Sequence, residues 1–130
     1  MWLNLTTPNH LNINSLMKNL VDVGSRTKLF AQDIVFLEAS SNYTLLYLAD
    51  GQKLVVSYHL GKLHERLLGC NFFIRPNRNI IVNMHFLMSY TADSLHINQR
   101  TINISRRRKE MIFEHIKNSL NQKFKYTAKT

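Results

Sequence analysis

The feature that most constrains the fold is a succession of short apolar segments between residues 26 and 104, separated by turn-forming residues. Several of them alternate apolar and polar side chains, which is the period of a strand that buries one face. Short strands joined by short turns form antiparallel sheets, so we expect a mostly β fold. The expected strands cover residues 28–30, 34–38, 44–49, 53–57, 72–75, 80–83, 86–90, 94–97 and 101–104.

Two dipeptides within this region indicate hairpins. Asp50-Gly51 stands between two expected strands, and this pair is a strong hairpin signal because both residues tolerate a positive φ. Asn98-Gln99 has the same position between the last two strands. We expect the strands on either side of each dipeptide to pair antiparallel.

One helix should interrupt the strands, at residues 58–68. Ser57 can cap its start, and Gly69 can supply a left-handed residue at its end. Cys70, which follows, is expected to be a small buried residue. The helical spacing of four leucines predicts the buried face of this helix, at positions 60, 63, 67 and 68.

Helical spacing also appears on both sides of the strand-rich region. Residues 13–23 predict a short amphipathic helix that Gly24 could close, and such a helix needs a partner because it is marginal alone in water. The partner would be either the protein's own sheet or another protein. A second helix should follow Ser105, a candidate N-cap. Its apolar residues are Ile112, Phe113, Ile116 and Leu120.

The expected organisation is one domain with short flanks, since 130 residues suit a single core. Residues 1–25 form a leader with the short helix, residues 26–109 the main domain, and residues 110–130 a helix with a basic tail.

Positive charge accumulates towards the carboxyl end. The chain has a formal net charge of +9, and residues 100–130 hold nine basic and two acidic residues. Such a gradient suits nucleic acid, an anionic membrane surface or an acidic protein. Four of these cations, Arg106 to Lys109, open the expected last helix, where each costs roughly 0.3 to 1 kcal/mol against the helix dipole. A helix N-terminus binds phosphate readily, so a polyanion is the first partner to test.

Enzyme chemistry finds little support in the sequence. The six histidines lack metal-ligand spacing, the single cysteine cannot make a cysteine-rich zinc site, and the eight carboxylates form no evident pair. We expect no catalysis, no metal, no cofactor and no small-molecule substrate. No apolar run approaches the roughly 18 residues of a membrane span, and the start does not resemble a signal peptide. The protein is therefore expected to be cytoplasmic and not bound to membrane.

Two further loops are rich in groups that can make hydrogen bonds. Residues 40–43 gather Ser40, Ser41, Asn42 and Tyr43 where a sheet would otherwise use a tight turn. Residues 75–79 join two apolar strands, and Pro76 within them restricts the backbone. Arginine and asparagine suit the edges of guanine and adenine in a major groove. Ordinary solvated turns are the alternative interpretation of both loops.

Three blocks of sequence resemble, in order and spacing, the LytTR DNA-binding domain of bacterial transcriptional regulators. The blocks are FLEA at residues 36–39 with NYT at 42–44, FIRPNRNIIVN at residues 73–83, and ISRR at residues 104–107. The resemblance implies an elongated arrangement of small antiparallel sheets that places loops in successive major grooves. It also implies binding to paired direct repeats upstream of promoters, which allows a homodimer on the repeats.

The resemblance carries DNA-reading positions onto this chain. It implies that Asn42 or Tyr43, Arg78 and Arg107 contact bases. The family's second block commonly has histidine and serine where this chain has Asn77 and Asn79, so the preferred DNA sequence does not transfer. The neighbouring DNA contacts that it implies are Asn77, Asn79, Ser105, Arg106 and Arg108, with Lys109 at the phosphates.

Double-stranded DNA is therefore the expected partner, and two other functions compete with it. An RNA-binding module could stack bases on exposed aromatics such as Tyr43, although no strand carries the aromatic pair of an RNA-recognition motif. An interaction protein could use residues 13–23 or the last helix to pair with another regulator.

Overall fold

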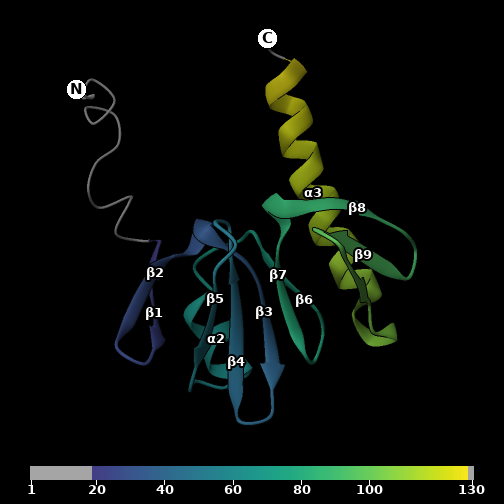
Figure 1. Ribbon diagram of the computed structural model, residues 1–130. Helices are drawn as coiled ribbons and strands as arrows, with labels where there is room; N and C mark the ends of the chain where they lie inside the picture. The colour runs from purple at the N-terminus through teal and green to yellow at the C-terminus, as the bar shows by residue number, and fades with distance from the viewer. Residues whose placement is uncertain (1–18, 129–130) are drawn as a thin grey trace, which may run out of the picture.

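The computed structural model describes the backbone of residues 19–128 and the side chains of residues 19–119. Its strands form three antiparallel sheets that lie side by side (Figure 1). The small sheet pairs β1 with β2, the central sheet has the order β5-β4-β3-β7-β6, and the third has the order β10-β9-β8. The fold is therefore mostly β, as predicted.

Apart from β1, the bounds of the strands agree closely with the segments predicted from alternation. The strands are β1 (Leu20–Gly24), β2 (Thr27–Phe30), β3 (Ile34–Ser40), β4 (Tyr43–Leu48), β5 (Lys53–Val56), β6 (Phe73–Asn77), β7 (Ile80–Asn83), β8 (Leu87–Tyr90), β9 (Ser94–Ile97) and β10 (Arg100–Asn103). The helices are α2 (Leu60–Arg66) and α3 (Lys109–Ala128), with short 3-10 turns at Ala31–Asp33, Met84–Phe86 and Arg106–Arg108.

The central sheet buries both of its faces against different partners. On one face, Leu37 and Ile81 belong to an apolar cluster that includes Leu60 and Leu63 of α2. On the other face, Val82 belongs to a second cluster formed with β9, β10 and α3. A strand buried on both sides needs no polar alternation, which explains the continuous apolar run of β7.

Both predicted hairpins are confirmed. Gly51 has a φ of +92° in the turn between β4 and β5, where the pair with Asp50 was expected. Asn98 has a φ of +52° between β9 and β10.

The helix predicted at residues 13–23 is wrong where the structure describes it. Leu20–Gly24 is a strand, in which Val21 and Val23 are buried and Asp22 lies between them. The spacing of the apolar residues in this short segment fits a strand as well as a helix. The turn that follows selects the strand, because Gly24, Ser25 and Arg26 all have a positive φ and reverse the chain into β2. Residues 13–18 lie outside the described residues, and the predicted domain boundaries stay predictions.

The predicted helix within the sheet region exists as α2, but its ends differ from the expectation. Leu60, Leu63 and Leu67 are buried as predicted, whereas Leu68 is 72% exposed. His59 occupies the N-cap, and no side chain caps there. Gly69 is not left-handed.

The end of α2 is closed by main-chain hydrogen bonds. The N–H of Leu67 bonds to the carbonyls of Leu63 and His64, and the N–H of Cys70 bonds back to Leu67 over 2.9 Å, so the chain turns without a left-handed residue. Cys70 is buried as predicted, and burial raises the pKa of its thiol.

Candidate nucleic-acid interface

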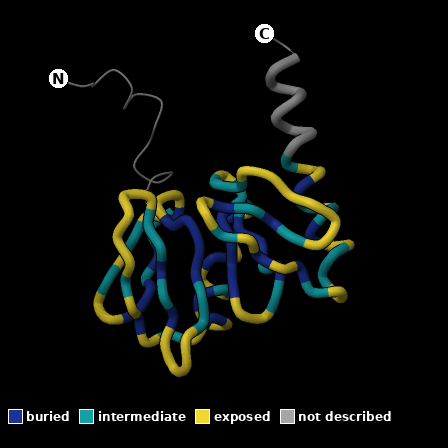
Figure 2. The backbone as a smooth tube through the Cα atoms, turned by 45° about the vertical axis from the view of Figure 1, so that its right-hand side comes forward, coloured by how far each residue is buried: buried dark blue, intermediate teal, exposed yellow. Residues whose placement is uncertain are grey.

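The three predicted loops lie along one edge of the molecule. In Figure 1 the β3–β4 turn, the β6–β7 turn and the Arg106–Arg108 turn all lie on the lower side. Hydrogen bonds join them in series: the N–H of Ala39 donates to the carbonyl of Asn79 over 2.8 Å, and the N–H of Ser105 donates to that of Pro76 over 2.9 Å. Figure 2 shows that the tips of the β3–β4 and β6–β7 turns are exposed. The loops thus form one connected surface.

The first loop is tighter than predicted. Ser40 pairs with Tyr43 at the ends of β3 and β4, so only Ser41 and Asn42 form the turn. Ser41 has a φ of +51°, which a short polar residue can adopt in a two-residue turn. All four side chains are exposed, and Tyr43 is 53% exposed. The turn therefore presents one amide and one aromatic ring to solvent.

The second loop is held by its own side chains. The Nδ2 of Asn77 donates to the carbonyl of Asn103 over 2.7 Å, and its Oδ1 accepts from the N–H of Asn79 over 2.9 Å. The Nη2 of Arg75 donates to the carbonyl of Arg78 over 2.8 Å. Arg78 and Asn79 remain exposed. Asn77 and Arg75 thus fix the backbone from which these two side chains project.

The third loop differs from the expected helix start. Arg106–Arg108 is a 3-10 turn after Ser105, and α3 begins only at Lys109. Lys109 makes an ion pair with Asp93, and the Nη1 of Arg108 donates to the carbonyl of Arg75 over 3.4 Å. The unfavourable contact of four cations with the helix dipole is therefore reduced. Arg106 and Arg107 are exposed.

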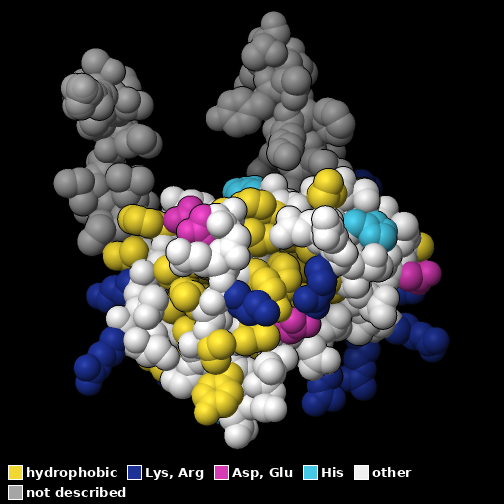
Figure 3. Space-filling model, viewed as in Figure 1, with side chains coloured by type: hydrophobic (Ala, Val, Ile, Leu, Met, Phe, Trp, Pro, Cys, Tyr) yellow, Lys and Arg dark blue, Asp and Glu magenta, His cyan; other side chains and the backbone are white. Residues whose placement is uncertain are grey.

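This edge has an uncompensated positive charge. In the part of the chain whose side chains are described, the acidic partners of the three salt bridges are Asp22, Glu38 and Asp93, and none of them pairs with an arginine of the second or third loop. Figure 3 shows Lys and Arg side chains projecting at the lower right of the molecule, below the third sheet. Such a concentration of cations attracts a polyanion.

Two half-buried residues, Arg75 and His64, lie behind the exposed arginines of this edge. Burial, and after it the charge of Arg108, lowers the pKa of Arg75. Burial also lowers the pKa of His64 on α2, and the charges of Arg75 and Arg108 add to this effect. No spacing in the sequence indicates that His64 lies near the loops, because only the packing of α2 brings it there.

The described residues offer no candidate for a metal site or for a membrane-spanning helix. Among them, no group of three or more histidine, cysteine, aspartate or glutamate side chains could hold a metal ion. The described helices also include none that is both long and apolar enough to cross a bilayer.

Comparisons with known proteins point to one family. The sequence model of the LytTr DNA-binding domain matches residues 25–117. Among solved structures, the fold is similar to the LytTr DNA-binding domain of a Bacillus cereus protein described as a methyl-accepting/DNA response regulator, with a TM-score of 0.61 and 18% identity. That match covers 75% of this chain and 96% of the other. A search of curated proteins gave no significant match.

Proposed function

The chain belongs to the LytTR DNA-binding domain family, and from this premise we propose that it is a transcriptional regulator that recognises specific duplex sequences through its three loops. The observation that carries the proposal is the hydrogen-bonded series of loops along one edge, in which exposed arginines have no acidic partner in the described part of the chain. A rigid row of loops can present side chains to adjacent grooves at a fixed spacing.

The loops divide into base readers and phosphate contacts. Arg78 and Arg107 are exposed, and a guanidinium fork matches the two acceptors of guanine in the major groove. Asn42 or Tyr43 reads a base at the first turn. Arg106, Arg108 and Lys109 bind phosphates, which give affinity without sequence preference. Ser105 and Asn79 lie beside these groups as further DNA contacts.

Asn77 has a different role from the one that the resemblance implied. Both polar atoms of its side chain are engaged by the protein, one with Asn103 and one with Asn79. We therefore assign Asn77 to positioning of the second and third loops relative to each other. Loss of this residue would disturb base reading without removing a base contact.

The DNA target that we propose is a pair of direct repeats upstream of a promoter, occupied by two copies of the chain. Two copies on adjacent repeats would each contribute one row of loops, and a contact between the copies would raise the affinity of the pair above that of one copy by effective concentration. Regulation of this kind takes place in the cytoplasm, where bacterial DNA is accessible.

A competition experiment tests the proposal. A labelled duplex bound to the protein is displaced by unlabelled duplex or by single-stranded RNA of the same sequence, at one fixed salt concentration, with fluorescence anisotropy as the readout. We expect duplex DNA to displace the label at a much lower concentration than RNA does. Displacement by RNA at equal or lower concentration would support an RNA-binding module instead.

A further inference from the structure

The turn between β1 and β2 lies in the same row as the three loops of the candidate interface. In Figure 1 this purple turn is at the lower left, followed across the lower side by the β3–β4 turn, the β6–β7 turn and the Arg106–Arg108 turn. Figure 2, which views the molecule from another side, also places the β1–β2 turn at the lower side and shows that it is exposed. This turn thus stands at the end of the row, next to the first loop.

The backbone of the β1–β2 turn does not favour an arginine. Gly24 pairs with Thr27, so Ser25 and Arg26 form a two-residue turn, with φ values of +54° and +59°. Two consecutive positive φ angles suit asparagine and glycine, whereas the Cβ of an arginine makes this conformation costly. Strained residues of this kind cluster where a side chain has a function. A contact of Arg26 outside the fold would account for its presence in this turn.

The positive charge at the turn end of the small sheet has no acidic partner. Arg26 and Lys28 are both exposed, and the salt bridges in the described part of the chain include neither of them. Asp22 lies opposite Lys28 in the register of β1 and β2, but its carboxylate pairs with Arg66 over 3.4 Å. Figure 3 shows basic side chains projecting at the left of the molecule. The turn therefore presents two cations to solvent.

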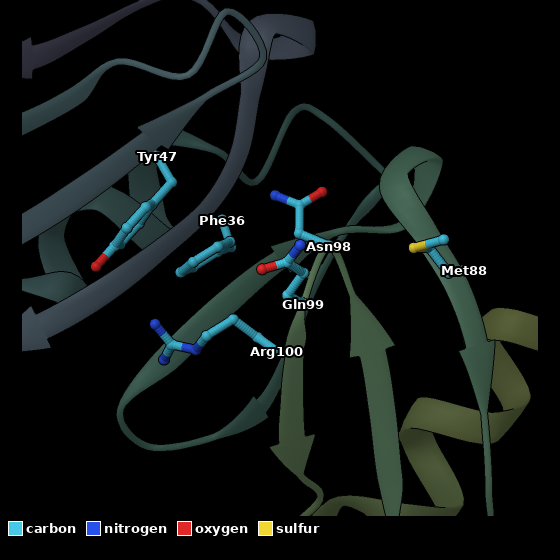
Figure 4. Close-up of a pocket in the computed structure, with 6 residues that line it drawn as sticks. All are labelled: Phe36, Tyr47, Met88, Asn98, Gln99 and Arg100. Atoms are coloured by element: carbon cyan, nitrogen blue, oxygen red, sulfur yellow. The ribbon is translucent and has the colours of Figure 1, made fainter.

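Arg100, which directly follows the β9–β10 turn, shows the contrasting arrangement. Its guanidinium donates to the carboxylate of Glu38 over 2.6 Å and lies 5.1 Å from the centroid of the Phe36 ring. Figure 4 shows Arg100 beside the rings of Phe36 and Tyr47. The charge of Arg100 is thus compensated within the fold. The cation–π contacts of the described residues, by contrast, do not involve Arg26, so its guanidinium is available to a partner.

The β1–β2 turn is fixed to the strand that carries the first loop. Gly24 is buried, and a Cβ at this position would lie 3.1 Å from the ring of Tyr58, so the turn packs closely on that ring. The hydroxyl of Thr44, the residue after Tyr43, donates to the carbonyl of Tyr58 over 2.7 Å. Thr44 itself is fully buried in β4. Tyr58 therefore connects the turn to the first loop, and the two can present side chains at a constant spacing.

We propose that the β1–β2 turn is a fourth DNA-binding loop, in which Arg26 and Ser25 bind phosphates beyond the base pairs that the first loop contacts. Arginine and serine are common phosphate ligands, and the charge of Lys28 adds to the attraction. Because the turn stands at the end of the row, these phosphates belong to the flank of the recognised sequence. This inference rests on the proposed function and extends its footprint in one direction.

Duplexes of different length test the position of this contact. Each contains one copy of the preferred sequence and is extended by about one helical turn on one side, on the other side, or on neither. Anisotropy titrations at several salt concentrations measure the salt dependence of the affinity of the whole chain. On one of the two extended duplexes, Arg26→Gln should lower the slope of log affinity against log salt by about 1, as the loss of one phosphate contact predicts. On the other two duplexes the wild type and Arg26→Gln should agree.

Three further variants separate charge, base reading and stability. Arg26→Lys retains the positive charge and should retain the wild-type slope, because a phosphate does not require the planar fork that a guanine edge does. Lys53→Gln removes an exposed positive charge at the opposite end of β4 from the first loop, and it should leave the slope unchanged. Arg26→Gly should lower the slope like Arg26→Gln, yet resist urea at least as well as the wild type, because glycine adopts a positive φ without steric cost.

A wild-type slope for Arg26→Gln on every duplex would overturn the fourth contact, as would an equal loss in Lys53→Gln. A loss that is absent on a random duplex of the same length, and that lysine does not rescue, would show base reading and overturn the assignment to phosphate. An equal loss on all three duplexes would overturn the position beyond the first loop. A less stable Arg26→Gly variant would assign the arginine to the turn itself rather than to DNA. Failure of the wild type to bind any duplex would instead contradict the proposed function as a whole.

Discussion

The main-chain N–H of Ser105 donates a hydrogen bond of 2.9 Å to the carbonyl oxygen of Pro76, so the third loop begins directly beside the second. Pro76 is buried, and the register of β6 against β7 shifts between Ile74 and Asn77. The irregular strand β6 therefore leads into the tight β6–β7 turn and also supplies the carbonyl that binds the start of the third loop. Base reading by the second and third loops depends on this shared support.

Removal of the Asn77 side chain should show whether this residue positions the loops or contacts DNA itself. Asn77→Ala loses the bonds to Asn103 and Asn79, so we expect about 1 kcal/mol less stability toward denaturant, because water partly replaces these exposed bonds. Affinity for the preferred site should fall by about tenfold, equal to about 1.4 kcal/mol. Asn118→Ala, at an exposed position on α3, is the control; it should bind the preferred site like the wild type and be no less stable, because alanine favours a helix more than asparagine does. Unchanged affinity in Asn77→Ala would refute a positioning role.

Substitution of the two exposed loop arginines should remove specificity rather than general affinity. Arg78→Ala and Arg107→Ala should each cost about 1 to 3 kcal/mol on the preferred duplex and little on random duplex. Arg107→Lys retains the charge but loses the planar fork, so it should behave like the alanine variant. Anisotropy titrations on both duplexes measure the difference. Equal losses on the two duplexes, or full rescue by lysine, would mean that these residues only neutralise phosphates.

The turn that follows β1 should require glycine at position 24. Gly24 has a φ of +90°, and an added Cβ would lie 3.1 Å from the ring of Tyr58. Gly24→Ala should therefore cost about 1 to 2 kcal/mol of stability. Gly61→Ala in α2 meets no atom within 4 Å and should instead add about 0.5 to 1 kcal/mol. Urea denaturation of both variants checks the pair, and a neutral Gly24→Ala would argue against the positive φ and the close approach to Tyr58 at this position.

The stability of the protein should depend on His64 in mildly acidic solution. Burial and the charges of Arg75 and Arg108 lower the pKa of His64 below its ordinary 6.5. In the pH window between the two pKa values the unfolded chain binds more protons than the folded one, so stability falls as the pH drops through 6.5 and stops falling below the folded-state pKa.

His64→Gln should remove this component, and its loss of stability between pH 7 and the acid side of the window should be smaller than that of the wild type. Thermal melting over a pH series provides the comparison. Parallel pH curves for the two proteins would show that neither burial nor the charges of Arg75 and Arg108 lower the pKa of His64.

The strands and hairpins were predictable because their signals are local. Alternation needs only adjacent residues, and Gly51 and Asn98 adopt the positive φ that their turns demand. The strand β1 was missed because the spacing of its apolar residues fits both a helix and a strand. Its pairing with β2 and the burial of Val21 and Val23 settle the choice, and neither is a local property.

The three loops of the site could be predicted from the sequence, but the hydrogen bonds and packing that position them could not. The arginines stood out by charge and by the resemblance, whereas the bond from Asn77 to Asn103 joins residues 26 positions apart. His64 approaches Arg75 only through the packing of α2.

Selection of bound duplexes from a random library tests sequence-specific recognition most directly. The wild-type chain should enrich one motif, present as two direct repeats separated by one or two turns of the duplex, and a chain with both Arg78→Ala and Arg107→Ala should enrich none. Failure of the wild type to enrich any motif, or equal enrichment by the double variant, would contradict base reading by these loops.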